Sequence, residues 1–294
     1  MKLTIITINY NGSENTIKLL ESLKNQADKD FEIIVVDNNS DDVEKLMTYQ
    51  TTETNISYIK NDRNLGFSGG NNIGIKKALD PPAGGGTDWV LLLNNDTWAE
   101  DTFTGRLKAI LEGKDGIIGL ALDEGNRTVF AGLIQWLKPT LIHLPTSQVG
   151  NIKSVDNLYV IGGAMAIHKN VFDKIGFLNE NYFLYFEDAD FCQRARKAMV
   201  PVSFFPEIKI SHSVSASTKK LGSPLLLRYH YRNSLYFNSK NGPWHIKLLL
   251  WPWSWQIVVK QIIKIIASKN KEQSLAILKG VGDWYSSRMG KIHD

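Results

Sequence analysis

Apolar and polar positions alternate in blocks along the first third of the chain. Short apolar runs lie within Leu3–Ile8, Phe31–Val36, Ile56–Lys60 and Asp88–Thr97. A run of four to eight apolar residues bounded by turn residues is typical of a buried strand, and the mixed segments between such runs are typical of helices. The pattern predicts successive βαβ units, hence an α/β fold with a mostly parallel sheet flanked by helices.

Capping residues, prolines and glycines indicate the other elements. Ser13 is a good N-cap for a helix that reaches Asn25, and a second helix is expected from about Val43. The glycine-rich segment 66–74 leads into a helix expected over Asn72–Leu79. Further expected elements are a loop over Pro81–Gly86, a strand with a Gly-Gly kink over Leu158–His168, a short helix over Asn170–Ile175, a helix that starts at Glu187 and a strand over Val202–Phe205.

Acidic or amide side chains follow three of the predicted strands. Asn9 and Asn11 follow the first, Asp37 follows the second, and Asp96 ends the run within 88–97. Ligands of open α/β sheets bind beyond the carboxyl ends of the strands, so these side chains are expected to line one edge of the sheet. For Asp96 taken alone, an Asx turn that merely ends the strand is an equally good interpretation.

Glycine spacing excludes two common nucleotide-binding classes. No G-x-G-x-x-G follows the first strand and no G-x-x-x-x-G-K-[ST] occurs, so the chain is neither an ordinary Rossmann dehydrogenase nor a P-loop ATPase. The segment from Gly66 to Gly74 could let backbone amides approach a phosphate or a sugar. A plain turn before a helix is the alternative.

A second acidic cluster, Glu187-Asp188-Ala189-Asp190, follows the aromatic run Tyr182–Phe186. These acids could simply interact with the dipole at a helix N-terminus. They could also hold a general base, because like charges this close raise at least one pKa and the aromatic wall would exclude water. His212 is structural or, together with Asp96, a ligand of a divalent cation.

Composition and charge divide the chain unevenly. Hydrophobic residues make up 43% and charged residues 22% of the 294 positions, which excludes a wholly disordered chain. Cys192 is the single cysteine, so an intrachain disulfide framework is excluded and a reducing, cytoplasmic setting is favoured. Residues 1–218 carry a net charge of −6 and residues 219–294 a net charge of +10.

The basic tail also holds five of the eight tryptophans, after residue 240. Its segment Trp244–Ala267 is apolar, with Pro252 expected to break or kink a helix there. Gln256, Lys260 and Lys264 share one face, and the opposite face holds Trp255, Val258, Val259, Ile262 and Ile266. The pattern is that of a helix lying in a membrane interface, peripheral to the inner face of a cell membrane.

Other interpretations of the tail stay open. The helix could pack on the preceding domain or at a homodimer interface, whereas a true membrane span is disfavoured by its lysines and proline. Nucleic-acid binding is also disfavoured, because the tryptophans lie in an apolar helix and are not interleaved with arginines.

The polar clusters, taken in order, carry a resemblance to the family 2 glycosyltransferases of the GT-A type, in particular their bacterial rhamnosyltransferase-like branch. The matching stretches are Thr7–Gly12, Val36–Asp41, Asn64–Gly74, Leu93–Asp96, Phe186–Phe191 and His212. They span about residues 1–235. The resemblance implies a GT-A glycosyltransferase domain over 1–235, followed by a helical appendage over 236–294.

The resemblance also implies a donor site and a metal site. Asp37 would read the nucleotide base, with Asn9 and Asn11 bordering its pocket. Asp96 and His212 would hold Mg²⁺ or Mn²⁺ on the donor diphosphate, although Asn94 stands where the metal motif of the family has an acid. Further implied donor-binding positions are Asn39, Arg63, Gly66, Asn72 and Asn95.

The implied reaction is an inverting transfer with Asp188 as the catalytic base and Glu187 as its neighbour. The donor would be a dTDP-, UDP- or GDP-linked sugar, with dTDP-rhamnose the expected one, and the acceptor a cell-surface polysaccharide or a lipid-linked glycan. Such a reaction needs one base and one cation for the departing diphosphate. A non-catalytic nucleotide-sugar-binding protein is the alternative. A nucleotidyltransferase is disfavoured, because Asn9–Gly12 is short and uncharged.

Overall fold

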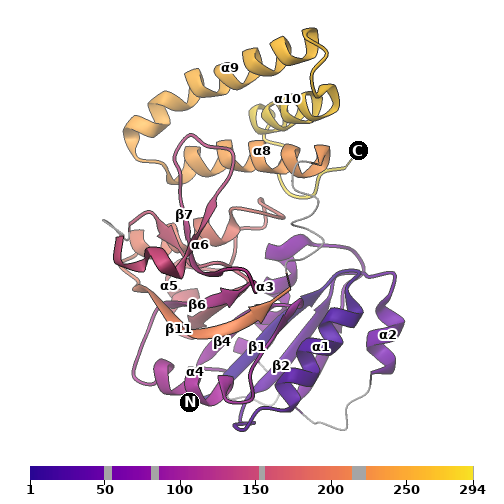
Figure 1. Ribbon diagram of the computed structural model, residues 1–294, viewed down its shortest axis with the longest axis vertical. Helices are drawn as coiled ribbons and strands as arrows, with labels where there is room; N and C mark the ends of the chain where they lie inside the picture. The colour runs from indigo at the N-terminus through magenta and orange to yellow at the C-terminus, as the bar shows by residue number, and fades with distance from the viewer. Residues whose placement is uncertain (50–54, 81–85, 152–155, 214–222, 294) are drawn as a thin grey trace.

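The computed structural model describes residues 1–49, 55–80, 86–151, 156–213 and 223–293. Its centre is one sheet with the strand order β3-β2-β1-β4-β10-β6-β11-β5, covered by helices on both faces (Figure 1). The strands on this path are β1 (Leu3–Asn9), β2 (Glu32–Asp37), β3 (Ile56–Lys60), β4 (Trp89–Asn94), β5 (Thr97–Trp98), β6 (Ile117–Asp123), β10 (Ala164–His168) and β11 (Val202–His212). Three further strands extend the sheet from β6: β7 (Thr128–Leu133), β8 (Ile142–Pro145) and β9 (Leu158–Tyr159).

The predicted βαβ units are present in the first part of the sheet. Strands β3, β2, β1 and β4 run parallel to one another, and β6 and β11 are also parallel. Strand β10 is antiparallel to both β4 and β6 and joins the two parallel groups. The fold is therefore α/β with a mixed sheet, and its parallel part lies at the N-terminal end of the chain.

Helices fill the predicted connections. They are α1 (Ser13–Lys24), α2 (Val43–Thr48), α3 (Gly66–Leu79), α4 (Phe103–Leu111), α5 (Lys169–Ile175) and α6 (Glu187–Lys197). Successive residues of the central strands point to two different cores. Ile5 packs with Leu19 of α1 and Leu107 of α4, whereas Ile6 packs with Ile75 of α3. This double burial explains why the central strands are apolar almost without a break.

Several elements differ from the sequence-based expectation. Helix α3 begins at Gly66 and not at Asn72. Its first amides are bonded from outside the helix: Gly66 N donates to Asn64 Oδ1 (2.8 Å) and Phe67 N donates to the carbonyl of Phe183 (2.8 Å). The contact with Phe183 comes from a distant part of the chain, so local glycine propensity could not reveal the early start.

Ser13 is not a helix cap. Gly12 holds the N-cap position of α1, and the Ser13 hydroxyl donates to Asp42 Oδ1 (2.9 Å). The expected strand over 158–168 is split into β9 and β10 by an irregular stretch that contains the two glycines. Strand β11 continues to His212 because a register shift between Phe205 and Lys209 lets it bend and go on pairing with β6. Of the loop expected over 81–86, residues 81–85 lie outside the described part.

Three helices stack at one end of the molecule: α8 (Pro224–Asn241), α9 (Trp244–Ile266) and α10 (Lys271–Tyr285) (Figure 1). Their shared core contains Leu235, Leu250, Ile257, Ile277 and Val281. The predicted domain boundary at residue 235 lies inside α8, and the division into two domains stays a prediction. Helix α9 continues through Pro252, so the expected break does not occur. No helix in the described ranges is long and apolar enough to cross a membrane.

Candidate active site

The polar strand ends meet at the carboxyl edge of the parallel strands. Asn9 of β1 pairs in register with Asp37 of β2, and Ile8 pairs with Asn94 of β4. The predicted line of amide and acidic side chains along one sheet edge is therefore present. This is the edge at which α/β proteins bind ligands.

Asp37 is held in place by buried partners. Its carboxylate accepts hydrogen bonds from Asn9 Nδ2 (2.8 Å) and from the backbone N–H of Ser40 (3.0 Å). Asn9 is completely buried, and its Oδ1 accepts from the Thr16 hydroxyl (2.9 Å). Asn9 thus fixes the orientation of the Asp37 carboxylate from the buried side. The expected contact of Asn9 with a donor stays a prediction.

Asn11 and Asn39 flank Asp37 on the exposed side. Both adopt positive φ angles, 51° and 63°, which amide side chains tolerate better than most others. Asn11 Oδ1 accepts from Asp41 N (2.7 Å), and Asn11 N donates to Ser40 Oγ (3.0 Å). These bonds join the loops that follow β1 and β2, so the two loops and Asp37 form one rigid rim.

The next candidates lie at the start of α3. Gly66 has a φ of +72°, and a Cβ there would lie 2.3 Å from the carbonyl oxygen of Phe183. Asn72 is buried and donates to the carbonyl of Leu178 (2.9 Å) and to Glu180 Oε1 (2.8 Å). Gly66 and Asn72 therefore join α3 to the segment before α6. Arg63 is exposed on the bend before α3.

Asp96 and His212, expected to form the metal site, lie next to each other. Asp96 Oδ1 is 3.2 Å from His212 Nε2, and both side chains are largely buried. Thr97 of β5 pairs with His212 of β11, and this short antiparallel pairing brings the two residues together. Asn95 points away from them and donates to Thr16 Oγ1 (3.0 Å).

The chemistry of this pair fits a divalent cation that is shared with a ligand. One carboxylate and one imidazole are ordinary ligands of Mn²⁺, and a carboxylate with added oxygens suits Mg²⁺. The described ranges contain no group of three or more His, Cys, Asp or Glu that could hold a metal. Asp96 and His212 alone would leave several coordination positions to the oxygens of a bound diphosphate and to water.

Glu124, which sequence reasoning did not single out, lies on the far side of His212. Its Oε1 is 3.9 Å from His212 Nδ1, a nitrogen without a hydrogen-bond partner in the described chain. A carboxylate behind a metal-binding histidine commonly sets its tautomer and orientation. Glu124 was difficult to identify from the sequence. It follows β6, and the histidine that it faces lies at the end of the parallel neighbour β11, which is distant in the chain.

The second acidic cluster holds Asp188 in a defined orientation. Its carboxylate accepts from the backbone N–H of Gly162 (3.1 Å) and from that of Ala189 (2.8 Å). Burial raises the pKa of Asp188 to about 6, and these hydrogen bonds oppose the rise. Asp188 is nevertheless partly exposed, so a second molecule can reach it.

The two neighbouring acids differ from Asp188. Burial, reinforced by the charge of Asp188, raises the pKa of Glu187 well above its usual range, as the like-charge argument predicted. Glu187 Oε2 has no hydrogen-bond partner within the described residues. Asp190 is instead a structural acid, bonded to Arg194 Nε (2.8 Å) and Asn241 Nδ2 (2.7 Å). The cluster therefore contains one partly exposed carboxylate, one buried acid and one ion-paired carboxylate.

The Gly-Gly kink connects the end of β4 to Asp188. Gly163 O accepts from Asn94 N (3.1 Å), while Gly162 N donates to Asp188 Oδ2 (3.1 Å). A Cβ on Gly163 would lie 2.8 Å from the Asn94 side chain, so the backbone passes close to Asn94 at this glycine. One short turn thus fixes the position of β4 relative to Asp188, and β4 leads to Asp96.

Helix α8 holds the loop that delivers Glu187 and Asp188. Phe183, Tyr185 and Phe186 have positive φ angles of 62°, 70° and 76°, a costly conformation for aromatic residues. Asn233 Nδ2 donates to three carbonyls of this loop, those of Tyr182 (2.9 Å), Leu184 (2.8 Å) and Tyr185 (3.2 Å).

Arg232 lies beside Asn233 and ties the same region to the end of the chain. It donates to the carbonyls of Tyr182 (3.4 Å) and Gly290 (2.8 Å). Sequence reasoning gave this pair no role, because nothing local links residues 232–233 to residues 182–186.

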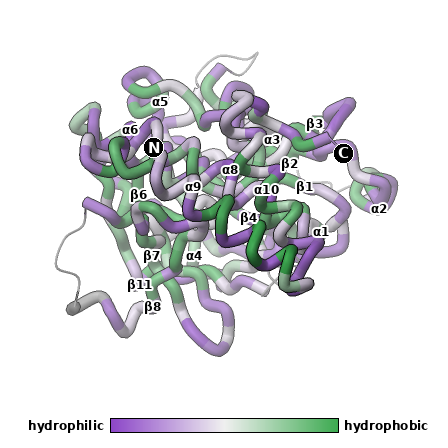
Figure 2. Tube along the Cα trace, turned by 90° about the horizontal axis from the view of Figure 1, so that it is seen from above, coloured by the Kyte–Doolittle hydropathy of each residue, from purple (hydrophilic) through white to green (hydrophobic). Residues whose placement is uncertain are grey.

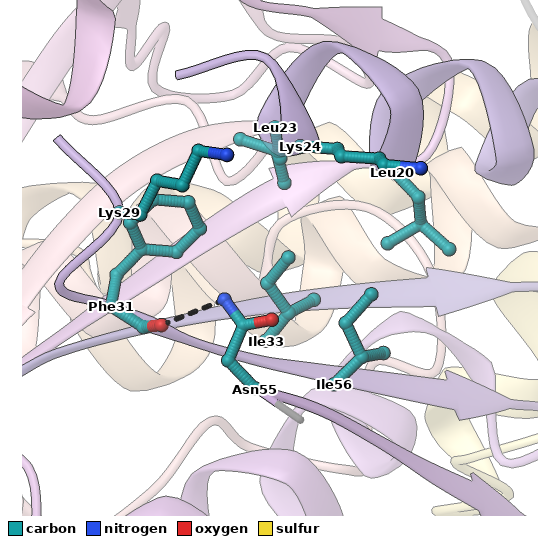
Figure 3. A pocket seen from close by; sticks show the side chains of 8 residues that line it. All are labelled: Leu20, Leu23, Lys24, Lys29, Phe31, Ile33, Asn55 and Ile56. Carbon is teal, nitrogen blue, oxygen red and sulfur yellow. Dashed lines mark hydrogen bonds between the residues drawn. The ribbon is translucent and has the colours of Figure 1, made fainter. Parts of the chain in front are cut away.

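An apolar indentation elsewhere on the sheet does not belong to this site. Figure 3 shows it between α1 and the amino ends of β2 and β3, with Asn55 Nδ2 donating to the Phe31 carbonyl (3.1 Å). Among the described residues that line it, none carries a carboxylate. The candidate active site is thus the carboxyl edge from Asp37 through Asp96 to Asp188.

Comparison with known proteins identifies the family. Residues 4–176 match the family model "Glycosyl transferase family 2". The chain is 28% identical over 243 residues to "Low-salt glycan biosynthesis hexosyltransferase Agl10" from Haloferax volcanii, a match that covers 79% of this chain and 73% of that protein.

Two bacterial relatives match as well. "dTDP-rhamnosyl transferase RfbF" from Shigella flexneri is 24% identical over 257 residues, covering 83% of this chain and 81% of that one. "N-acetylglucosaminyl-diphospho-decaprenol L-rhamnosyltransferase" from Mycobacterium tuberculosis is 18% identical over 302 residues, with 95% and 98% covered.

Solved structures share the fold. The mannosyltransferase PcManGT from Pyrobaculum calidifontis, in complex with GDP-Man and Mn²⁺, aligns with a TM-score of 0.57 at 12% identity over 97% of this chain and 87% of that one. S. aureus TarS 1-349 in complex with UDP-GlcNAc aligns with a TM-score of 0.55 at 16% identity over 98% and 81%. The protein is an inverting, rhamnosyltransferase-like glycosyltransferase, and the chain belongs to glycosyl transferase family 2.

Proposed function

We propose that the protein transfers a sugar from a nucleoside diphosphate donor to an acceptor hydroxyl with Asp188 as the catalytic base. The observation that carries the assignment is the state of this carboxylate. It is partly exposed, it is oriented by two backbone N–H groups, and its pKa is raised to about 6. A base of this kind is ionised at neutral pH yet basic enough to accept a proton in the transition state.

The proposed step balances without a covalent enzyme intermediate. The acceptor oxygen forms a bond to the anomeric carbon as its proton passes to Asp188. The bond from the anomeric carbon to the diphosphate oxygen breaks, and the nucleoside diphosphate leaves with that electron pair. Attack opposite to the leaving group inverts the anomeric configuration. Glu187 is buried, has no partner on Oε2 within the described residues and stays protonated. It therefore places no second negative charge beside the Asp188 carboxylate.

The donor is proposed to lie along the rim formed by Asp37, Asn11 and Asn39. Asp37 offers carboxylate oxygens to the N–H groups of a pyrimidine or purine base, and the two exposed amides offer contacts to the ribose. Asn9 would act by orienting Asp37. Four further residues are proposed to act near the donor: Arg63, Gly66, Asn72 and Asn95. Gly66, Asn72 and Asn95 would do so by shaping the site through the contacts described above.

Asp96 and His212 are proposed to hold Mn²⁺ or Mg²⁺ at the donor diphosphate. Bound there, the ion would neutralise negative charge that develops on the leaving group. Support comes from the ligand types of the pair, its burial, and the Mn²⁺ in the structure of PcManGT.

The proposed donor sugar is L-rhamnose from dTDP-rhamnose, and the proposed acceptor is a polysaccharide or a lipid-linked glycan. Support comes from the names of two relatives, a dTDP-rhamnosyl transferase and a rhamnosyltransferase that acts on a diphospho-decaprenol. A peripheral contact with a membrane would bring the enzyme to such an acceptor.

A donor panel tests the proposal. The full chain is incubated with Mn²⁺, lipid-linked and free glycan acceptors, and dTDP-rhamnose, UDP-GlcNAc or GDP-mannose in turn. The expected result is release of dTDP only when acceptor is present, with an inverted linkage in the product by NMR. Turnover with a UDP- or GDP-sugar alone would contradict the rhamnose assignment but leave the base assignment standing.

A second candidate function is a nucleotide-sugar-binding protein with little or no turnover. Asn94 in place of an acid favours it, because the metal pair then has a single carboxylate. Calorimetry would decide: donor binding with no nucleoside diphosphate released for any donor and acceptor, with either metal, would favour this candidate.

A further inference from the structure

Helix α9 has two apolar faces, and only one of them is covered. Its inner face packs on α8 and α10 through Ile246, Leu250 and Ile257. Its outer face is a stripe of seven residues spaced by three or four positions, here called the outer stripe: Trp244, Leu248, Trp251, Trp255, Val259, Ile262 and Ile266. At 3.6 residues per turn this spacing runs along the side of the helix roughly opposite to the inner face.

The outer stripe is far more exposed than apolar side chains on an ordinary surface helix. Trp244 is 75% exposed, Trp255 62% and Ile266 79%. The outer face of a surface helix is normally polar. Figure 1 shows α9 as the outermost layer at its end of the molecule, and Figure 2, seen from that end, shows hydrophobic residues recurring along its length. Contiguous exposed apolar surface of this kind marks an interaction site.

The charge of α9 indicates what covers the stripe. The helix contains Lys247, Lys260 and Lys264 and no acidic residue, within a tail of net charge +10. By helical spacing the three lysines lie beside the inner face and not on the outer stripe. With the stripe pressed into lipid tails, their long side chains can reach the headgroup layer.

We propose that α9 docks flat on an anionic lipid bilayer, with the outer stripe buried in the interface. Tryptophans favour this depth of a membrane, and basic residues are attracted to its negative surface. A second copy fits less well, because a two-fold contact through α9 would bring together two tails that each carry a net charge of +10.

Docking in this way would place the active-site loop close to the lipid surface. Helix α8 lies directly under α9, and from α8 Asn233 binds the loop that precedes Asp188. Helices α9 and α8 therefore both lie between the proposed membrane surface and the loop that precedes Asp188. The inference agrees with a lipid-linked acceptor, but it is tested by lipid binding and does not depend on the reaction.

Vesicle flotation with the full chain tests the proposal. The protein is mixed with vesicles of phosphatidylcholine alone or with phosphatidylglycerol added, at low and high salt. The expected result is flotation with the anionic vesicles, at least tenfold weaker with the neutral ones and weakened by salt. Trp255→Glu and Ile262→Glu should each reduce binding at least tenfold, and Lys260→Gln/Lys264→Gln should reduce binding to anionic vesicles only.

Met199→Glu is the matched control, since it adds the same charge at an apolar residue that is 88% exposed outside the tail. It should bind vesicles as the unchanged protein does, and all variants should keep the same circular dichroism and the same thermal shift with donor. Two results would overturn the proposal: no binding of the unchanged protein to anionic vesicles, or binding that the stripe variants do not weaken. A dimer in sedimentation that Ile262→Glu dissociates, without vesicle binding, would assign the stripe to a second copy.

Discussion

At the scale of single residues, the site depends on how differently two adjacent acids are surrounded. Asp188 receives two backbone N–H bonds and reaches solvent, while Glu187 is buried and has one oxygen without a partner in the described chain. Both pKa values are raised, chiefly by burial. The environment, not the residue type, thus makes the two neighbouring carboxyl groups differ.

The pH dependence of turnover should report Asp188. Because its pKa is raised to about 6, the carboxylate becomes protonated as pH falls through that value and can no longer accept a proton. We expect kcat at saturating donor and acceptor to be level above pH 7 and to fall about tenfold per pH unit well below 6. A kcat that stays level down to pH 4.5 would contradict the assignment.

Glu187→Gln should change how stability depends on pH. In the unfolded chain Glu187 releases its proton near the ordinary value, but in the folded chain its raised pKa retains the proton. The folded state therefore binds more protons above pH 4.5, and stability falls as pH rises. The variant lacks this loss, so its stability relative to that of the unchanged protein should rise between pH 5 and 8 in urea unfolding. If the free energies of unfolding of the two proteins changed with pH in parallel, the pKa of Glu187 would not be raised by burial in the folded state.

At the scale of elements, the catalytic edge is assembled from parts that are distant in the chain. The turn at Gly162-Gly163 joins β4 to Asp188, and Asn233 of α8 holds the loop before α6. Three aromatic residues of that loop, Phe183, Tyr185 and Phe186, have positive φ angles, a costly conformation that the surrounding contacts must hold in place.

Asn233→Ala should therefore lower kcat while leaving donor affinity nearly unchanged. The change removes three hydrogen bonds to the loop and should cost about 1–3 kcal/mol of stability as well. Asn238→Ala is a matched control, because Asn238 is equally buried on α8 but bonds to Leu137 N and the Ser234 carbonyl. Single-turnover rates and donor titrations separate the two effects. Equal losses of kcat in both variants would mean that the loop contact has no special role.

The sequence predicts most of these elements but not how they join. Strand periodicity and polar clusters singled out Asp37, Asp96 and Asp188 as candidates, because each lies at a local change of pattern, and the family resemblance supplied their expected roles. The early start of α3 was missed, since a carbonyl from Phe183 completes its first turn. Glu124 and Asn233 were missed for the same physical reason: their partners come from strands and loops far away in the chain.

At the scale of the whole molecule, ligand binding should stabilise the fold through the metal pair. A ligand that binds only the folded state at 100 times its Kd adds about 2.7 kcal/mol. We expect dTDP and Mn²⁺ together to raise the melting temperature more than either alone. His212→Ala should remove the metal-dependent part of this rise and Asp173→Asn, at an exposed acid on α5, should keep it. A metal-dependent rise that persists in His212→Ala would place the metal elsewhere.

The sharpest test of the account is the rate of sugar transfer by Asp188→Asn, with donor affinity measured on the same sample. Asparagine keeps the shape, and its one side-chain oxygen can still accept one of the two hydrogen bonds that Gly162 N and Ala189 N donate to different oxygens of Asp188, but it cannot take up the acceptor proton. The account expects kcat to fall by about 10²–10⁴-fold, with donor Kd within about twofold of the unchanged protein. Transfer by Asp188→Asn at the rate of the Asp173→Asn control would contradict it.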